Sequence, residues 1–365
     1  MKLLVCAGGT GGGVYPALVV LERLESDLTL DVLWVGSEGG MEADLVTRAG
    51  INYTTIPAAG VHGVGLKALP GNLARLMRGY GAARKVVQNF KPDVMFFTGG
   101  YVAGPVALAG RKIPTAIYVP DIEPGLALKL LARFADRIAV TVNESRHYFS
   151  HKDRVVVTGY PIRPSLSKWK LDEAYRVFGF SSELPTLLVT GGSLGALSIN
   201  NALTDSLPKL LSEMQIVHLT GSKTWDRFKS VSGSLDEQYR TRYKAFPYLH
   251  EKMGAAFTIA DLVVSRAGAS SIGEYPHFGI PAILVPYPHA WRYQKINADY
   301  LSKQGAAITL ANEDLSEQLV PMILNLIRDS GKRETMSRKM QSLAFQDAAG
   351  QIAAQLTELA ELPGV

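Results

Sequence analysis

The chain has 365 residues, 47% of them apolar, and a formal net charge of +5. This length exceeds what a single hydrophobic core usually serves, so two domains are expected. The positive charge suits phosphate-bearing ligands or an anionic membrane surface, and since no nucleic-acid-binding motif appears, nucleic acid is not an expected partner. The single cysteine, Cys6, excludes an internal disulfide, and no apolar run has the length of a signal peptide or a membrane span. A cytoplasmic protein is therefore expected.

Short apolar or β-branched runs alternate with helix-length amphipathic stretches along the whole chain, a pattern typical of parallel α/β sheets. Strands are predicted at residues 3–7, 32–35, 94–98, 115–119, 138–142 and 155–158, and again at 186–190, 216–220, 262–265, 282–286 and 306–310. A proline-containing break at 160–167 separates the two series. The predicted fold class is α/β, with two Rossmann-like, doubly wound parallel-sheet domains facing a cleft. They cover residues 1–162 and 163–344, with a C-terminal helix at about 345–365 packing back on the first.

Glycine-rich turns follow two predicted strands of the first half. Residues 8–13 join the first strand to a helix expected to begin near Pro16, and their backbone amides suit a diphosphate. They match neither the dinucleotide fingerprint nor the P-loop. Residues 99–104 form a second turn after the strand at 94–98. The alternative for both is that the glycines serve only tight turns.

The second half repeats the arrangement at residues 191–196, where Ser193 adds a hydroxyl that can donate to a phosphate oxygen. Further on, Glu274 can accept two hydrogen bonds from a ribose diol. Its alternative role is a capping box with Ser271, three residues earlier. Gln294 lies in a polar stretch where amides suit sugar hydroxyls. No metal-binding motif is present, and no metal is expected.

Six short motifs, taken in chain order, resemble the motifs of one protein family. They are AGGTGG at residues 7–12, MEADLV at 41–46, GGY at 99–101, GGS-x-GA at 191–196, SRAGA-x-x-x-x-E at 265–274 and a glutamine shortly before Asn297-Ala298. Together they span nearly the whole chain and resemble the MurG family of peptidoglycan N-acetylglucosaminyltransferases.

The resemblance implies a GT-B fold and a metal-independent, inverting hexosyltransferase without a cofactor. The muramyl 4-hydroxyl of lipid I would attack C1 of UDP-N-acetylglucosamine, giving lipid II and UDP in peptidoglycan synthesis. This would place the chain in cell-wall biogenesis, the cell cycle and the control of cell shape.

The resemblance also assigns residues. Glu274 would bind the ribose, Arg163 and Ser193 the phosphates, Gln294 the amino sugar and Leu249 the uracil. The donor site would further include Gly192, Arg266, Gly268 and Ala269. The acceptor pyrophosphate would lie on Thr10, Gly11, Gly12, Gly13, Gly100 and Tyr101.

Three positions depart from the family pattern. Gly13 stands where the family usually carries a histidine proposed to be catalytic, so the general base is open among His62, Asp121 and Glu123. His62 replaces an arginine, and residues 118–121 replace a His-Glu-Gln-Asn segment. Tyr293 stands in place of a second glutamine, which leaves the amino-sugar preference to Gln294.

A lipid-linked muramyl-peptide acceptor implies attachment to the anionic cytoplasmic membrane surface. Apolar Leu73, Leu76, Met77 and Tyr80 alternate with basic Lys67, Arg75, Arg78, Arg84 and Lys85, a pattern that predicts a basic amphipathic helix. Its alternative is an ordinary helix that packs on the core. The expected location is peripheral, on the inner face of the plasma membrane, with other cell-wall synthesis proteins as further partners.

Two other functions stay open. A UDP-N-acetylglucosamine epimerase would use the donor alone, since that activity occurs on related two-domain folds. A noncatalytic relative that binds lipid I would fit the glycine at position 13.

Overall fold

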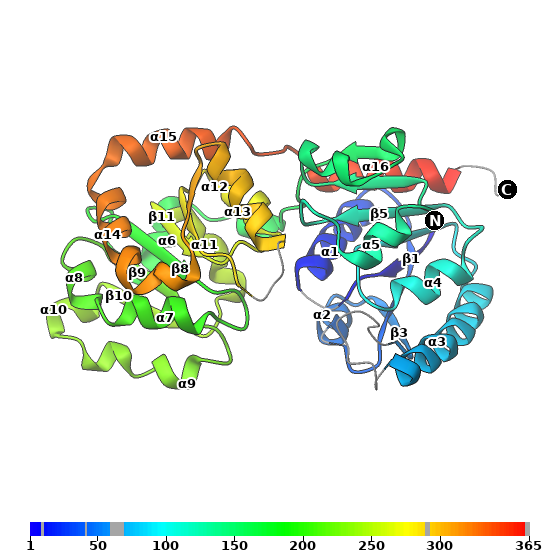
Figure 1. Cartoon of the computed structure of the whole chain (residues 1–365), viewed down its shortest axis with the longest axis horizontal. Coiled ribbons are helices and arrows are strands. Elements are labelled where there is room, and N and C mark those ends of the chain that lie inside the picture. Colours follow the sequence, from blue (N-terminus) through cyan, green and yellow to red (C-terminus); the bar gives the residue numbers. More distant parts are fainter. Residues whose placement is uncertain (9–10, 41, 59–68, 289–292, 362–365) are drawn as a thin grey trace. The chain divides into compact units, whose positions relative to one another are not determined.

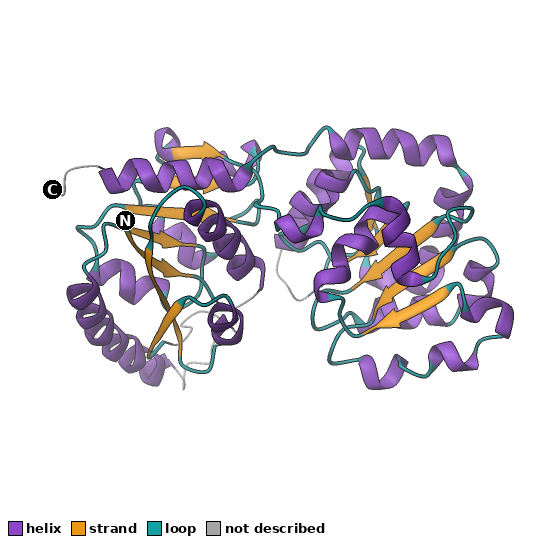
Figure 2. Ribbon diagram, turned by 180° about the vertical axis from the view of Figure 1, so that it is seen from behind, coloured by secondary structure: helices purple, strands orange, loops and turns teal. Residues whose placement is uncertain are grey.

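The computed structural model describes residues 1–8, 11–40, 42–58, 69–288 and 293–361. The chain folds into two compact units, Met1–Ile162 with Phe345–Val365, and Arg163–Ala344. In each unit a parallel sheet lies between layers of helices (Figures 1 and 2).

The first unit has a seven-stranded sheet in the order β3-β2-β1-β4-β5-β6-β7, with every neighbouring pair parallel. Its strands are β1 (Lys2–Cys6), β2 (Asp31–Ser37), β3 (Asn52–Ile56), β4 (Val94–Phe97), β5 (Thr115–Val119), β6 (Arg137–Val140) and β7 (Val155–Val157). Its α-helices are α1 (Gly11–Glu25), α2 (Glu42–Arg48), α3 (Leu69–Phe90), α4 (Ala103–Ala109), α5 (Leu126–Leu131) and α16 (Ala348–Glu361).

The core of this unit explains why its central strands are uninterrupted apolar runs. Strands β4 and β5 are buried along their whole length, as expected for strands covered by helices on both faces. On one face, Ala83 of α3, Val106 of α4 and Leu128 of α5 join one core cluster with residues of the strands. The C-terminal helix α16 packs against α1, so the chain returns to its first unit at its end.

The second unit has a six-stranded parallel sheet in the order β10-β9-β8-β11-β12-β13. Its strands are β8 (Thr186–Thr190), β9 (Gln215–Leu219), β10 (Tyr243–Phe246), β11 (Leu262–Ser265), β12 (Ala282–Leu284) and β13 (Ala307–Thr309). Its α-helices are α6 (Leu171–Phe178), α7 (Leu197–Thr204), α8 (Leu207–Leu211), α9 (Trp225–Phe228), α10 (Glu237–Arg240), α11 (Met253–Ile259), α12 (Ser271–Phe278), α13 (Tyr293–Lys303), α14 (Leu315–Arg328) and α15 (Ser330–Gln341). Both sheets therefore have the doubly wound order of Rossmann-like folds, as predicted.

Two expectations were wrong in detail. The structure adds the edge strands β3 and β10, which the sequence pattern did not predict. Helix α1 begins at Gly11 rather than near Pro16, and Pro16 lies inside it. The helix tolerates this proline because the carbonyl left without an intrahelical donor belongs to Gly12, in the first turn.

Candidate functional site

Three loops of the first unit meet at the carboxyl edge of neighbouring strands β1, β4 and β5. The glycine turn at residues 8–13 follows β1, Gly100 and Tyr101 follow β4, and Asp121 and Glu123 follow β5. This edge is where ligands bind in open α/β sheets. The topology therefore brings the predicted acceptor residues and two of the three base candidates to one edge.

The two glycine turns are in direct contact. A Cβ on Gly100, whose φ is +92°, would lie 3.3 Å from the backbone nitrogen of Gly8. The Thr98 hydroxyl donates to the Gly13 carbonyl at 2.7 Å. Because Gly11, Gly12 and Gly13 form the first turn of α1, their N–H groups have no intrahelical acceptor and suit an anion.

Position 13 leaves little room for a side chain. Gly13 is buried, and a Cβ there would lie 3.1 Å from the Thr98 hydroxyl oxygen and 3.2 Å from the Thr98 carbonyl oxygen. A histidine at this position would require Thr98 to shift. Because Gly13 has no side chain, a catalytic base would have to come from another residue.

The base candidates differ in exposure. Asp121 is half-buried, whereas Glu123 is only 4% exposed. Burial raises the pKa of the Tyr118 hydroxyl, and the charge of Asp121 raises it further. The hydrogen bond between Tyr118 and Thr141 opposes this rise. His62 and Thr10 lie outside the described residues.

Glu42, in the MEADLV motif, is a candidate site residue to which the sequence analysis assigned no role. Its carboxylate is buried and accepts from the Ser37 backbone N–H at 3.0 Å and the Ser37 hydroxyl at 3.1 Å. Gly8 and Gly40 make room for it, since a Cβ on either would come within 3 Å of the carboxylate.

In the second unit, the glycine turn at residues 191–196 joins β8 to α7. Gly192 has a φ of +81°, and its N–H donates to the Thr190 hydroxyl at 3.2 Å. Ser193 is exposed. The turn thus presents a hydroxyl to solvent at the carboxyl edge of β8.

Arg163 and Glu274, predicted to contact phosphate and ribose, lie together. An Arg163 guanidinium nitrogen is 3.4 Å from a Glu274 carboxylate oxygen, and both side chains are largely buried. Burial raises the pKa of Glu274, while Arg163 and Ser270 oppose the rise. Ribose and phosphate are adjacent in a nucleotide, so adjacent receptors for the two are geometrically consistent.

The capping-box alternative for Glu274 is wrong. Helix α12 begins at Ser271, and the Ser271 hydroxyl donates to the Gly268 carbonyl at 2.6 Å instead of accepting from the helix. Glu274 is therefore not required as a cap.

Two further predicted donor residues make contacts within the protein. The Arg266 guanidinium donates to the carbonyls of Val285 and Pro286 and to the Ser198 hydroxyl, at 2.9–3.2 Å. These contacts tie the ends of β11 and β12 to α7. The Gln294 side-chain oxygen accepts from the Tyr287 backbone N–H at 2.8 Å, which leaves the amide NH2 as a donor.

The remaining predicted donor residues follow strand ends of the same sheet. Gly268 and Ala269 follow β11, and a Cβ on Gly268 would meet no atom within 4 Å. Leu249 is buried and follows β10.

Helix α3 packs on the core and also exposes apolar side chains. Its Ala83 and Val87 belong to the core, whereas Met77 is 71% and Tyr80 37% exposed and Leu76 is half-buried. The side chain of Leu73 is outside the described part of the chain.

Two features are absent from the described residues. No group of three or more His, Cys, Asp or Glu side chains within them is arranged to hold a metal ion. None of their helices combines the length and apolarity needed to cross a membrane.

Two doubly wound units with glycine turns at their strand ends form a two-domain GT-B-like fold. Residues 3–140 match the glycosyltransferase family 28 N-terminal domain, and residues 186–352 match the C-terminal domain of that family. A UDP-N-acetylglucosamine--N-acetylmuramyl-(pentapeptide) pyrophosphoryl-undecaprenol N-acetylglucosamine transferase of Roseiflexus sp. is 37% identical, over 98% of this chain and 95% of the relative. The chain belongs to this transferase family, the MurG family.

Solved structures agree on the fold. MurG of Acinetobacter baumannii superposes with a TM-score of 0.75 at 25% identity, covering 98% of this chain and 99% of that one. A UDP-GlcNAc 2-epimerase of Neisseria meningitidis, solved with UDP-GlcNAc bound, reaches 0.67 at 16% identity, covering 98% and 100%. The second likeness is one of fold alone.

Proposed function

We propose that the chain transfers N-acetylglucosamine from UDP-N-acetylglucosamine to the muramyl 4-hydroxyl of lipid I, with inversion, to form lipid II. Family membership supports the reaction. The observation that carries the donor assignment is the Arg163–Glu274 pair, two receptors for adjacent parts of a nucleotide, in the unit that also holds Ser193.

In this proposal UDP is held by the second unit. The Glu274 carboxylate accepts from the ribose hydroxyls, and Arg163 and Ser193 contact the diphosphate. The leaving UDP gains negative charge in the transition state, so a guanidinium and a hydroxyl aimed at the phosphates stabilise it more than the ground state. The acceptor pyrophosphate lies on the glycine turns of the first unit, on the free N–H groups of α1.

The direct test measures UDP release with a lipid I analogue, together with analysis of the sugar product. A disaccharide product that forms only with both substrates supports the transferase. Conversion of the donor sugar without acceptor would identify an epimerase, the activity of one protein with this fold. Binding of both substrates without UDP release would identify a noncatalytic relative.

The proposed mechanism needs no metal, because the Arg163 guanidinium and the Ser193 hydroxyl stabilise the negative charge on the leaving UDP. We expect a chelator to leave the rate of UDP release unchanged within about twofold, since loss of a metal that stabilises a transition state costs several kcal/mol. The assay compares enzyme dialysed against EDTA with the same sample after added Mg²⁺. A rate that depends on Mg²⁺ would contradict this part of the proposal.

Glu274 should make UDP binding depend on pH. Because its pKa is raised by burial, it becomes protonated at a higher pH than an exposed glutamate, and a protonated carboxyl accepts ribose hydrogen bonds less well. UDP affinity should therefore fall as the pH drops through this raised pKa. Folding stability should depend on pH in the opposite direction. The contribution of Glu274 to folding stability is present at low pH and is lost as the pH rises through the folded-state pKa.

Calorimetric titration of UDP across pH tests this prediction on the wild type and on Glu274→Gln, which has no titrating group at the position. The variant corrects for the ionisation of UDP itself. Identical pH profiles for the two proteins would rule out a role for Glu274 ionisation.

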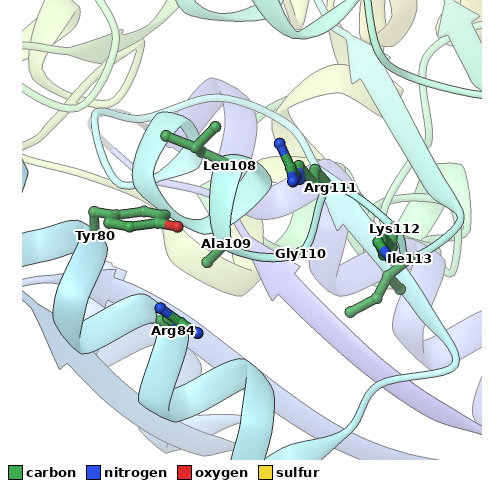
Figure 3. A pocket seen from close by; sticks show the side chains of 8 residues that line it. All are labelled: Tyr80, Arg84, Leu108, Ala109, Gly110, Arg111, Lys112 and Ile113. Carbon is green, nitrogen blue, oxygen red and sulfur yellow. The ribbon is translucent and has the colours of Figure 1, made fainter.

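We also propose that the surface around α3 and α4 attaches the protein to the anionic inner face of the plasma membrane, near its lipid-linked acceptor. A cavity of about 600 Å³ lies between α3 and the segment that ends α4. Figure 3 shows the side chains that line it. It is lined by Tyr80, Arg84, Leu108, Ala109, Gly110, Arg111, Lys112 and Ile113. Apolar side chains beside basic ones suit a lipid surface, where each basic residue contributes about 1 kcal/mol.

Replacing Met77 by glutamate should weaken binding to vesicles that contain anionic lipid by about tenfold, because the change removes an inserting side chain and adds a repelled charge. Co-sedimentation with vesicles at increasing salt measures the effect. Leu171→Glu is the matched control, because Leu171 is 52% exposed in the second unit. Equal loss in both variants, or no wild-type binding at low salt, would refute the assignment of this surface.

A further inference from the structure

The turn that follows β9 packs on the glycine turn proposed to hold the donor phosphates. Gly195 and Gly221 both have a φ of +87°, and a Cβ on Gly221 would lie 2.1 Å from the Gly195 backbone. A Cβ on Gly195 would lie 2.1 Å from the Thr220 carbonyl oxygen. The two turns therefore touch backbone to backbone, which only glycine permits here.

Ser222 donates two hydrogen bonds to the Ser193 carbonyl. Both the backbone N–H and the hydroxyl of Ser222 donate to the Ser193 carbonyl, each at 3.1 Å. Two donors on one carbonyl oxygen hold that peptide group in place. The Ser193 side chain stays exposed at the carboxyl edge of β8.

A buried chain of hydrogen bonds holds the turn that carries Ser222. The Asn200 side-chain nitrogen donates to the Thr220 carbonyl at 2.9 Å, and the Asn200 side-chain oxygen lies 3.0 Å from Nε2 of His218. Nδ1 of His218 lies 2.8 Å from the Tyr243 hydroxyl. Asn200, His218 and Tyr243 come from α7, β9 and β10, so the hydrogen bonds join α7 to the two strands at one edge of the sheet.

The hydrogen bonds of this network also determine which tautomer His218 adopts. Because the Asn200 oxygen only accepts, Nε2 of His218 carries the proton, and Nδ1 accepts from the Tyr243 hydroxyl. Burial lowers the pKa of His218 to about 3, so it is neutral at physiological pH. A fully paired neutral network of this kind is rigid.

We propose that Ser222 and Asn200 are positioning residues for the donor diphosphate, acting through the Ser193 peptide. The proposal rests on the donor site proposed above. Ser222 acts directly on Ser193, and Asn200 acts through the Thr220 carbonyl on the turn that carries Ser222. Neither residue is assigned a contact with the substrate.

Ser222→Ala removes one of the two donors to the Ser193 carbonyl. We expect UDP affinity to weaken about three- to tenfold, which corresponds to the free energy that one hydrogen bond contributes. KM for the donor should rise by the same factor, with kcat and the midpoint of thermal unfolding unchanged. Ser212→Ala is the matched control, because the Ser212 hydroxyl also donates to a backbone carbonyl, that of Lys209, on an exposed helix end.

Asn200→Asp tests the buried chain. It keeps the size of the side chain and the contact with His218 but places an oxygen opposite the Thr220 carbonyl. UDP affinity should fall at least about tenfold, because two acceptors then face each other in a buried position. This variant also loses stability, so Ser222→Ala keeps the test decisive if Asn200→Asp does not fold.

Calorimetric titration of UDP into the full chain separates the outcomes. If the wild type binds no UDP, the donor-site proposal is wrong. If the wild type binds UDP and Ser222→Ala binds it equally well, or if Ser212→Ala loses as much affinity, the positioning proposal is wrong while the donor site stands.

Discussion

Replacing Glu274 by alanine should weaken UDP binding about 100-fold or more. The carboxylate is proposed to accept two hydrogen bonds from the ribose, and charge-assisted hydrogen bonds contribute about 1.5–3 kcal/mol each. Its loss also removes the ion pair with Arg163, at 3.4 Å. Calorimetric titration of UDP and the donor KM are the measurements, and both should change by the same factor.

Glu213→Ala is the matched control for this prediction. Glu213 also pairs with an arginine of the second unit, Arg328, but it does so on the surface, where ion pairs contribute little. Its removal should leave UDP affinity unchanged. If Glu274→Ala binds UDP as tightly as the control, the ribose assignment is wrong.

The strands that the sequence predicted and those it missed differ in composition and burial rather than in their place in the sheet, since the edge strands β7 and β13 were predicted. Strands such as β5 and β8 are buried on both faces, so each is an uninterrupted apolar run that stands out in the sequence. Strands β3 and β10 lie at sheet edges, and their sequences NYTTI and YKAF are mostly half-exposed. Such short segments, which mix polar and apolar residues, show no clear alternation. Only their pairing with a neighbouring strand identifies them as strands.

The candidate site was predictable in its parts but not in its contacts. Order and spacing of motifs placed Ser193, Glu274 and the glycine turns at strand ends. The pairing of Arg163 with Glu274, 111 residues apart, depends on tertiary structure. The same holds for Arg266, which the resemblance assigned to the donor site and whose guanidinium donates to the carbonyls of Val285 and Pro286.

Exposure separates the described candidates for the catalytic base. A base must reach the acceptor hydroxyl directly or through one water. Glu123 is buried, so its carboxylate is unsuited to meet a substrate, whereas Asp121 is half-buried at the same edge. Strands β1 and β5 are separated by β4, so the axes of β1 and β5 lie about 10 Å apart, and Asp121 follows β5 at the edge where the glycine turn follows β1.

Asp121→Asn should therefore lower kcat by about 10²- to 10⁴-fold, the usual contribution of a general base, while UDP affinity stays unchanged. The substitution keeps the size of the side chain and removes its ability to take up a proton. UDP release with a lipid I analogue measures kcat, and titration of UDP alone confirms that the donor site is intact. The control is Glu144→Gln, because Glu144 is an exposed carboxylate that follows the neighbouring strand β6. This variant should retain full activity.

The main effect of Glu123→Gln should be a loss of folding stability rather than a loss of kcat, because the Glu123 side chain is buried. A larger loss of kcat in His62→Ala than in Asp121→Asn would transfer the role of base to His62.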